Sequence, residues 1–353
     1  MKVDLMAFGM PLRRAQVLAA DAERAGFAGV VVTEGGRTAY LTCAAMALAA
    51  TGLELSTGIA VAFPRSPMVS AQVAWELADA SAGRFRLGLG AQVAAHIRRR
   101  YDAPFDRPAR RLAEYVRAVR ACFAAFRGEA PLHFEGDFYR LTLLPPMWSP
   151  GPIGAPDPAI DMAAVNPLML RLAGEVADGV QVHPLNHRRY LAEMVRPELA
   201  AGARRAGRDP ASLRISVPVL TAAGETDEDQ WRWREAARAQ VAFYGSTPNY
   251  ALLFELLDRP DTTARLRERQ KAGDLPGMAA VIDDELLDHF VVQGTFGQVA
   301  DRLAQRYGGL ADRLVLYFAG ASWERDGADF ERYGELARRL AAAPESGAAG
   351  RMG

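Results

Sequence analysis

The feature that most constrains the fold is a regular alternation of short apolar segments with amphipathic ones. The segment 27–33 is rich in valine and has no polar alternation, which is typical of a strand covered on both faces in a parallel sheet. Eight strands are expected, at 3–8, 27–33, 53–62, 85–89, 159–164, 179–183, 213–221 and 314–318. Helices are expected at 11–25, 40–50, 68–81, 108–127, 166–178, 187–206, 296–307 and 323–342.

This alternation predicts a (β/α)8 TIM barrel, because strands that alternate with helices form a parallel sheet. A doubly wound open sheet is the alternative. We expect one catalytic domain over residues 1–342, with insertions at about 128–158, which is rich in proline, and at about 226–290, which is helical and charged. The small, polar residues 343–353 are expected to form a disordered tail.

The charge balance argues against nucleic-acid binding. The chain has 42 Lys and Arg residues against 42 Asp and Glu residues, so it lacks the basic excess that nucleic acid attracts. No apolar run reaches membrane-spanning length, and the N-terminus lacks a signal-peptide core. Cys43 and Cys122 lie in alanine-rich helical contexts, which favours buried free thiols in a reducing cytoplasm. We therefore expect a cytoplasmic protein that binds a small-molecule substrate without a metal ion.

In a TIM barrel, functional side chains lie at the C-terminal ends of the strands. The second strand leads into Glu34, which could act as a general acid or base or could orient Arg37. The alternative is a solvated loop carboxylate. Gly58 interrupts the third strand, which indicates either a bulge with close backbone approach or a glycine needed only for packing.

The segment 83–100 is expected to form the fourth strand, a glycine turn and the start of a basic helix. Gly88 and Gly90 leave no side chain between the backbone and a flat or phosphorylated ligand, although a tight turn would need the same residues. His96 lies about one turn into the helix. The arginines near it could bind an acidic ligand or could form a solvated helix face. They are Arg98, Arg99, Arg100 and Arg107.

Two further strand ends carry polar residues. Asn166 and Pro167 begin the helix after the fifth strand, and the free N–H groups of that helix could bind a phosphate. Ordinary helix capping is the alternative. His183 ends the sixth strand, and it could face the site or simply close the strand.

Residues Gly83 to Ile97 resemble the fourth-strand motif of the bacterial luciferase-like monooxygenase superfamily, and most of all its branch that uses the deazaflavin coenzyme F420. The segments 134–139, 160–180 and 294–299 also resemble segments of this superfamily. The resemblance runs from the first strand to the eighth. It implies a barrel with insertions, a homodimer, and a flavin-type ring beside a bulge in the third strand that often contains a non-proline cis peptide in relatives.

The resemblance also implies where the cofactor binds. The bulge maps onto residues 58–60, the phosphate onto 165–166, and the contacts with the ring or ribityl chain onto 90–96. The cofactor-binding residues expected on this basis are Gly58, Ile59, Ala60, Gly90, Ala91, Gln92, His96, Ala164, Val165 and Asn166.

The chain departs from the family pattern at two places. Relatives often have His-Asp after the second strand, where this chain has Arg37 and Thr38. Ala91 stands where relatives often have a hydroxyl residue. Either the substrate chemistry differs from that of the relatives, or cofactor binding is weaker.

Three functions fit these observations. The first is hydride transfer between coenzyme F420 and a small organic substrate, with Glu34, Arg37 and His96 as the polar groups near the ring. The second is a monooxygenase that uses reduced FMN and oxygen. The third is a barrel without catalysis that binds a ligand or a partner, and the missing histidine after the second strand motivates it.

Overall fold

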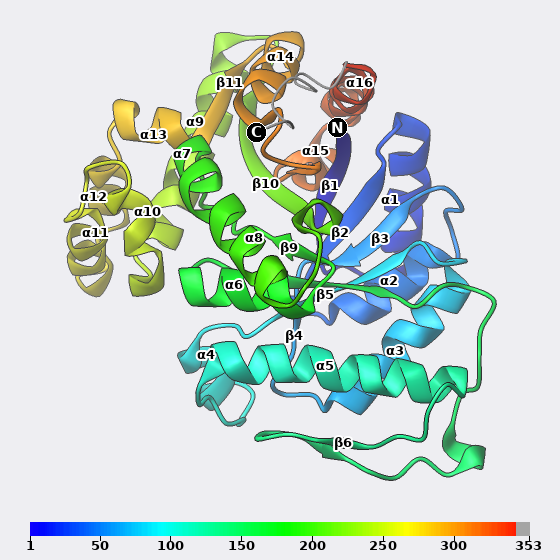
Figure 1. Ribbon diagram of the computed structural model, residues 1–353. Helices are drawn as coiled ribbons and strands as arrows, with labels where there is room; N and C mark the ends of the chain where they lie inside the picture. Colours follow the sequence, from blue (N-terminus) through cyan, green and yellow to red (C-terminus); the bar gives the residue numbers. More distant parts are fainter. Residues whose placement is uncertain (344–353) are drawn as a thin grey trace.

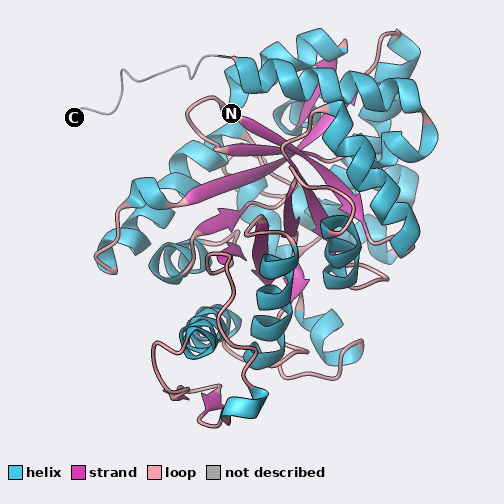
Figure 2. Cartoon of the chain, turned by 90° about the vertical axis from the view of Figure 1, so that its right-hand side faces the viewer, coloured by secondary structure: helices cyan, strands magenta, loops and turns pink. Residues whose placement is uncertain are grey.

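The structure is a computed structural model that describes residues 1–343, so the predicted tail lies outside the described residues apart from Ala343. Eight parallel strands form a closed ring in the order β10-β12-β1-β2-β3-β5-β8-β9, and β9 pairs back with β10. Closure of the ring confirms the TIM barrel and excludes the open sheet (Figures 1 and 2). The strands are β1 (Lys2–Phe8), β2 (Gly29–Thr33), β3 (Glu54–Thr57), β5 (Phe85–Gly90), β8 (Ala159–Ala163), β9 (Gly179–Gln181), β10 (Arg214–Ala223) and β12 (Arg313–Leu316).

Helices surround the ring of strands in Figure 2. The predicted capping box at the start of α14 is confirmed, because Thr295 accepts from the Gln298 N–H and the Gln298 side chain accepts from the Thr295 N–H. The predicted final helix is divided at Asp326, whose side chain caps the second part. The helices around the barrel are α1 (Leu12–Ala25), α2 (Ala39–Ala47), α3 (Pro67–Ala80), α4 (Ala94–Arg99), α5 (Pro108–Arg127), α6 (Pro167–Val176), α7 (Arg188–Tyr190), α8 (Arg196–Arg205), α14 (Phe296–Tyr307), α15 (Ala319–Arg325) and α16 (Gly327–Ala342).

The third barrel strand is interrupted as the sequence predicts. After β3 ends at Thr57, the chain leaves the ladder and returns as β4 (Ala60–Val61), which pairs with the end of β5. The peptide bond between Gly58 and Ile59 is cis. The expected bulge and the expected cis peptide are therefore both confirmed.

The first predicted insertion is held against α5. It contains a short antiparallel pair, β6 (Phe134–Glu135) and β7 (Arg140–Leu141), where the sequence predicted only irregular structure. The Glu114 side chain on α5 accepts hydrogen bonds from three consecutive backbone N–H groups, at residues 137–139. One carboxylate thus fixes the hairpin turn to the helix, and Figure 1 shows the hairpin along the lower side of α5.

The second predicted insertion is helical, as expected. It comprises α9 (Asp227–Gly245), α10 (Ala251–Glu255), α11 (Thr262–Lys271), α12 (Leu275–Val281) and α13 (Asp284–Phe290), and Figure 1 shows α10 to α13 grouped at one side of the barrel. It is followed by β11 (Val291–Gly294), which the sequence analysis missed. This strand pairs with the far end of β10, at residues 220–223, beyond the part of β10 that belongs to the ring.

Ion pairs close the N-terminal end of the barrel interior. Arg313 on β12 forms a two-bond pair with Asp4 on β1. Arg214 on β10 pairs with Glu54 on β3 at 2.5 Å, although these strands are not neighbours, so the pair crosses the interior. A Cβ atom at Gly29 would lie 2.8 Å from the Asp4 Oδ1, so this glycine leaves the space that the carboxylate occupies.

Candidate functional site

The residues predicted from strand ends gather at one end of the barrel. Glu34 follows β2, and residues 58–60 interrupt the third strand. Gly90 ends β5, residues 91–92 follow it, and residues 164–166 and His183 follow β8 and β9. All of these strands are parallel, so their C-terminal ends meet at the same edge of the ring. The fold therefore brings the predicted site residues to one face, as expected for a TIM barrel.

The bulge is held by side chains from other strands. The Thr57 Oγ1 donates to the Gly88 carbonyl oxygen at 2.7 Å and accepts from the Gly88 N–H at 2.9 Å. The Gln181 Nε2, from β9, donates to the Ser56 Oγ at 3.0 Å and to the Thr57 carbonyl oxygen at 2.9 Å. Because β9 and β3 are not neighbours in the ring, Gln181 reaches across the barrel interior to do so. No sequence pattern indicated this role for Gln181.

The space beside the site glycines is filled by the protein itself. A Cβ atom at Gly88 would overlap the Thr57 carbonyl oxygen and the Gln181 amide, and one at Gly90 would lie 2.7 Å from the Ile59 side chain. At Gly58 a Cβ atom would overlap Val31. The side-chain directions of Gly88 and Gly90 therefore face protein atoms, and approach of a flat or phosphorylated ligand to their backbones stays a prediction. Contact of Gly58 and Gly90 with a cofactor through their backbones stays a prediction.

Glu34 forms an ion pair that the sequence analysis did not anticipate. Its Oε1 lies 2.5 Å from the Arg65 guanidinium, and its Oε2 accepts from the Val61 N–H at 2.9 Å. The carboxylate side chain is only 4% exposed. Burial opposes the charge of Arg65, but the Glu34 carboxylate more than offsets it and raises the pKa of Arg65. Glu34 thus anchors β4, and the idea that it orients Arg37 is wrong.

The basic residues after the fourth strand do not converge on one point. Arg100 donates to the Gly35 carbonyl oxygen at 2.5 Å, which joins α4 to the loop after β2. Arg98 donates to the Phe105 carbonyl oxygen at 3.0 Å, and Arg107 lies 3.4 Å from an Asp137 carboxylate oxygen. His96 is exposed, as is Arg37 in the loop after β2. The arginines therefore form a solvated helix face rather than a single site for an acidic ligand.

The start of α6 keeps free backbone donors. Asn166 occupies the N-cap position, but its side chain makes no capping hydrogen bond. The first bond inside the helix runs from the Leu170 N–H to the Asn166 carbonyl oxygen at 3.0 Å, so the N–H groups of the first turn are available. Val165 is oriented by the Tyr190 hydroxyl, which donates to its carbonyl oxygen at 2.8 Å, while Ala164 is buried.

An aromatic wall, formed by His183, Tyr244, Tyr250 and Tyr317, lies at the same end of the barrel. The His183 ring centroid is 4.6 Å from that of Tyr244 and 4.2 Å from that of Tyr250. The hydroxyls of Tyr244 and Tyr317 are 2.8 Å apart. Sequence reasoning singled out only His183, because Tyr244 and Tyr250 come from the second insertion, where no pattern connects them to a strand end.

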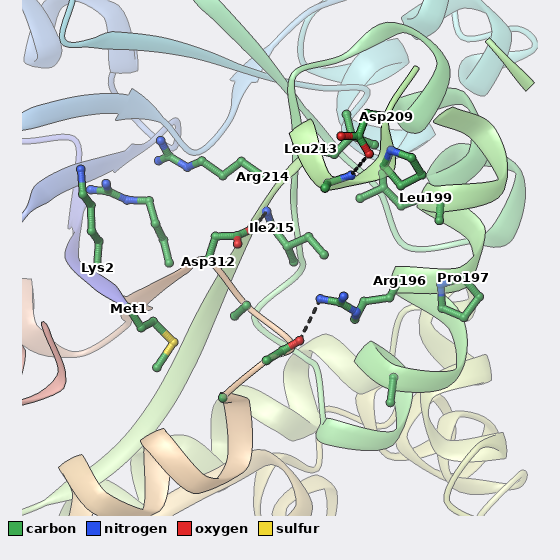
Figure 3. A pocket seen from close by; sticks show the side chains of 18 of the residues that line it. Met1, Lys2, Arg196, Pro197, Leu199, Asp209, Leu213, Arg214, Ile215 and Asp312 are labelled. Atoms are coloured by element: carbon green, nitrogen blue, oxygen red, sulfur yellow. Dashed lines mark hydrogen bonds between the residues drawn. The ribbon is translucent and has the colours of Figure 1, made fainter. Parts of the chain in front are cut away.

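A large open cavity lies at the opposite end of the barrel. Its volume is about 1220 Å³, and it is lined by the starts of β1, β10 and β12. Figure 3 shows Lys2, Arg196, Arg214 and Asp312 around it. This cavity is separate from the predicted site, because the N-terminal and C-terminal ends of parallel strands are at opposite faces of the barrel.

The described residues hold neither a metal-binding cluster nor a membrane-spanning helix. Within residues 1–343, no group of three His, Cys, Asp or Glu side chains is arranged to hold a metal ion. Nor does that part of the chain contain a helix that is both long enough and apolar enough to cross a membrane. Cys43 and Cys122 are both free and buried.

The chain is similar to proteins of one family. The family described as luciferase-like monooxygenase matches residues 2–313. An uncharacterized protein of Mycobacterium tuberculosis is 40% identical over 313 residues, which are 89% of this chain and 92% of that one. The 5,10-methylenetetrahydromethanopterin reductase of Methanolobus tindarius is 29% identical over 281 residues, which are 78% of this chain and 80% of the reductase.

Solved structures share the fold. The coenzyme F420 dependent tetrahydromethanopterin reductase of Methanopyrus kandleri matches with a TM-score of 0.78 and 20% identity, over 96% of this chain and 98% of the reductase. The oxygenating constituent of 3,6-diketocamphane monooxygenase of Pseudomonas putida, in complex with FMN, matches with a TM-score of 0.68 and 16% identity, over 97% and 98% of the two chains.

Proposed function

The chain belongs to the luciferase-like monooxygenase family, and on that premise we propose that it transfers a hydride between coenzyme F420 and a small organic substrate. The observation that carries this proposal is the pair of reductases. The Methanolobus enzyme is 29% identical to the chain, and the F420-dependent Methanopyrus enzyme has a higher TM-score than the FMN-containing monooxygenase. A single (β/α)8 catalytic domain that carries both insertions is part of this proposal.

The residues at the strand ends fit a bound deazaflavin. The free N–H groups at the start of α6 suit its phosphate, and the bulge at 58–60, held by Thr57 and Gln181, offers a backbone surface of defined shape. When bound, the cofactor supplies a carbon that gives or accepts hydride. The protein then has to hold two rings together and exclude water.

The three proposed catalytic residues have different surroundings. Glu34 is committed to Arg65 and to the Val61 N–H, so its proposed role is to position β4 beside the ring rather than to transfer a proton. Arg37 and His96 are exposed, so both are free to contact a bound molecule. We assign them polar contacts with the cofactor or the substrate.

Titration of the purified protein with oxidised coenzyme F420 and, separately, with FMN tests the proposal, with quenching of cofactor fluorescence as the readout. We expect saturable binding of F420 and weak or no binding of FMN. Preferential binding of FMN would overturn the proposal in favour of an oxygen-using monooxygenase, which the shared fold with the diketocamphane enzyme supports. Binding of neither would favour a barrel that has lost catalysis.

Replacing Asn166 by aspartate is expected to weaken F420 binding by about tenfold or more, which corresponds to about 1.4 kcal/mol. The new carboxylate would accept the free N–H groups of α6 and would repel the phosphate. Aspartate is a good N-cap residue, so the helix should persist. The control is Asn166→Ala, which leaves the donors free and should bind nearly as well as the parent protein. Equal affinity of all three proteins would refute the phosphate assignment.

Two further expectations belong to this proposal. We propose a homodimer, as the family resemblance implies, and exposed apolar side chains on the first insertion, Leu143, Met147 and Trp148, are compatible with burial against a second copy. Light scattering on the eluted protein would decide between one chain and two. The cytoplasmic location stays a prediction, which the free, buried cysteines support.

A further inference from the structure

The aromatic wall contains a histidine whose proton position follows from its contacts. The His183 Nδ1 lies 3.0 Å from the backbone nitrogen of Leu185. A backbone N–H can only donate, so this ring nitrogen must be the unprotonated acceptor. The neutral ring therefore carries its proton on Nε2. Within residues 1–343, this Nε2–H has no hydrogen-bond partner, although the side chain is only partly exposed.

The wall around this donor is uncharged near neutral pH. Burial lowers the pKa of His183 to about 3 and raises the pKa of Tyr250 to about 12. Burial likewise raises the pKa of Tyr244, whose hydroxyl bonds to that of Tyr317. A neutral imidazole and neutral phenols offer ring faces and hydrogen bonds, but no charge to pair with an ion.

The aromatic wall lies at the end of the barrel where the cofactor is proposed to bind. His183 follows β9, two residues after Gln181, the side chain that holds the bulge on which the cofactor is proposed to rest. Tyr317 follows β12 and contacts the half-exposed Phe8 at the end of β1, with ring centroids 6.0 Å apart. The wall thus joins the C-terminal ends of β9 and β12 through Tyr244, which the second insertion supplies together with Tyr250, and Phe8 lies beside it.

We propose that His183, Tyr244 and Tyr250 recognise an uncharged, ring-containing substrate whose carbonyl or hydroxyl oxygen accepts a hydrogen bond from the His183 Nε2–H. This inference rests on the proposed function, because it assigns the substrate class of the same site. Because the Nε2–H makes no hydrogen bond to the described residues, it is available to an acceptor on a ligand. Burying a carboxylate against this wall would be costly, because the wall supplies no cation. The wall should therefore discriminate against acids of the same shape.

Three probes of similar shape test this inference: acetophenone, which has a neutral acceptor, ethylbenzene, which has none, and benzoate, which is an anion. Their dissociation constants are measured by ligand-observed NMR with protein saturated with whichever cofactor binds, or with the apoprotein if neither binds. We expect acetophenone to bind about five- to tenfold more tightly than ethylbenzene, the factor that one hydrogen bond supplies, and benzoate to bind weakest.

The variants separate recognition from folding. His183→Phe keeps an aromatic ring but removes the donor, so it should bind acetophenone and ethylbenzene equally. His183→Gln restores a donor and should recover part of the preference. The control is His133→Phe, at an exposed histidine of the first insertion, which should behave as the parent protein. Cofactor affinity should be the same in all four proteins.

Failure of this inference and failure of the proposed function are distinguishable. If neither F420 nor FMN binds, the proposed function fails whatever the probes do. If a cofactor binds but acetophenone keeps its preference in His183→Phe, or benzoate binds as tightly as acetophenone, or no probe binds, the inference fails. Nitrogen-15 NMR gives a second readout: the His183 ring should stay neutral, with its proton on Nε2, from about pH 5 to 8, whereas an ordinary histidine would titrate within that interval.

Discussion

Replacing Arg313 by methionine is expected to lower the free energy of unfolding by about 3–5 kcal/mol. Asp4 and Arg313 are 1% and 3% exposed, and the Arg313 Nε lies 2.6 Å from the Asp4 Oδ2 in a two-bond pair. Removing the guanidinium leaves a carboxylate buried without its cation, which costs far more than the pair itself contributes. Urea unfolding followed by circular dichroism measures the loss.

The size of this loss should depend on pH. Burial raises the pKa of Asp4, and Arg313 is the largest influence that lowers it. Without Arg313 the folded-state pKa of Asp4 rises further above its unfolded value, so the folded protein holds the proton more tightly than the unfolded chain. Stability of the variant is therefore favoured at low pH and is lost as the pH rises through the folded pKa. The difference from the parent protein should be larger at pH 8 than at pH 5.

Two control variants test whether the loss of stability comes from a buried charge left without its partner. The double variant Asp4→Leu with Arg313→Met replaces both charges by apolar groups, and it should be more stable than Arg313→Met alone. Arg339→Met breaks an exposed pair with Asp301, whose side chains are 56% and 66% exposed, and should cost at most about 1 kcal/mol. Equal losses for Arg313→Met and Arg339→Met would contradict the assignment of a buried ion pair.

Replacing Gly88 by alanine is expected to weaken cofactor binding by at least about tenfold and to destabilise the protein by about 1–3 kcal/mol or more. The added methyl group would overlap the carbonyl oxygen of Thr57 and the amide of Gln181. The methyl group would meet backbone on one side and a buried, hydrogen-bonded side chain on the other. Neither neighbour can move away easily. Thr57 must move, and the bulge at 58–60 moves with it.

Gly35→Ala is the matched control, because a Cβ atom at this loop position meets nothing within 4 Å. Fluorescence titration with the cofactor, at a temperature where circular dichroism shows both variants folded, separates lost affinity from lost structure. A folded Gly88→Ala protein that binds the cofactor as tightly as Gly35→Ala would show that the bulge does not support the cofactor.

Local pattern was sufficient for the architecture. The alternation of apolar strands with amphipathic helices predicts the barrel, because each element shows its periodicity within a few consecutive residues. Gly58 marks the interruption of the third strand, and Asn166 with Pro167 marks the start of α6, for the same reason. The family resemblance adds the luciferase-like monooxygenase family, which the family match confirms.

The contacts inside the site depended on closure of the barrel. Glu34 and Arg65 are 31 positions apart, Gln181 and Ser56 are 125 apart, and the two residues of the Asp4 pair are 309 apart. No local period relates such positions. The missed strand β11 shows the same limit, because four residues become a strand only beside the overhanging end of β10.

The sequence by itself thus determined the eight strands of the ring and the helices that alternate with them, and therefore which strand-end residues reach the C-terminal edge of the ring. Only the tertiary structure decided what those residues do there. It joined Glu34 to Arg65 instead of Arg37, filled the space beside Gly88 with Gln181, and set His183 against two tyrosines of the second insertion. The physical reason is that side chains interact with whatever lies near them across the closed barrel. Residues far apart in the sequence come close together only when the eighth strand has paired with its neighbours.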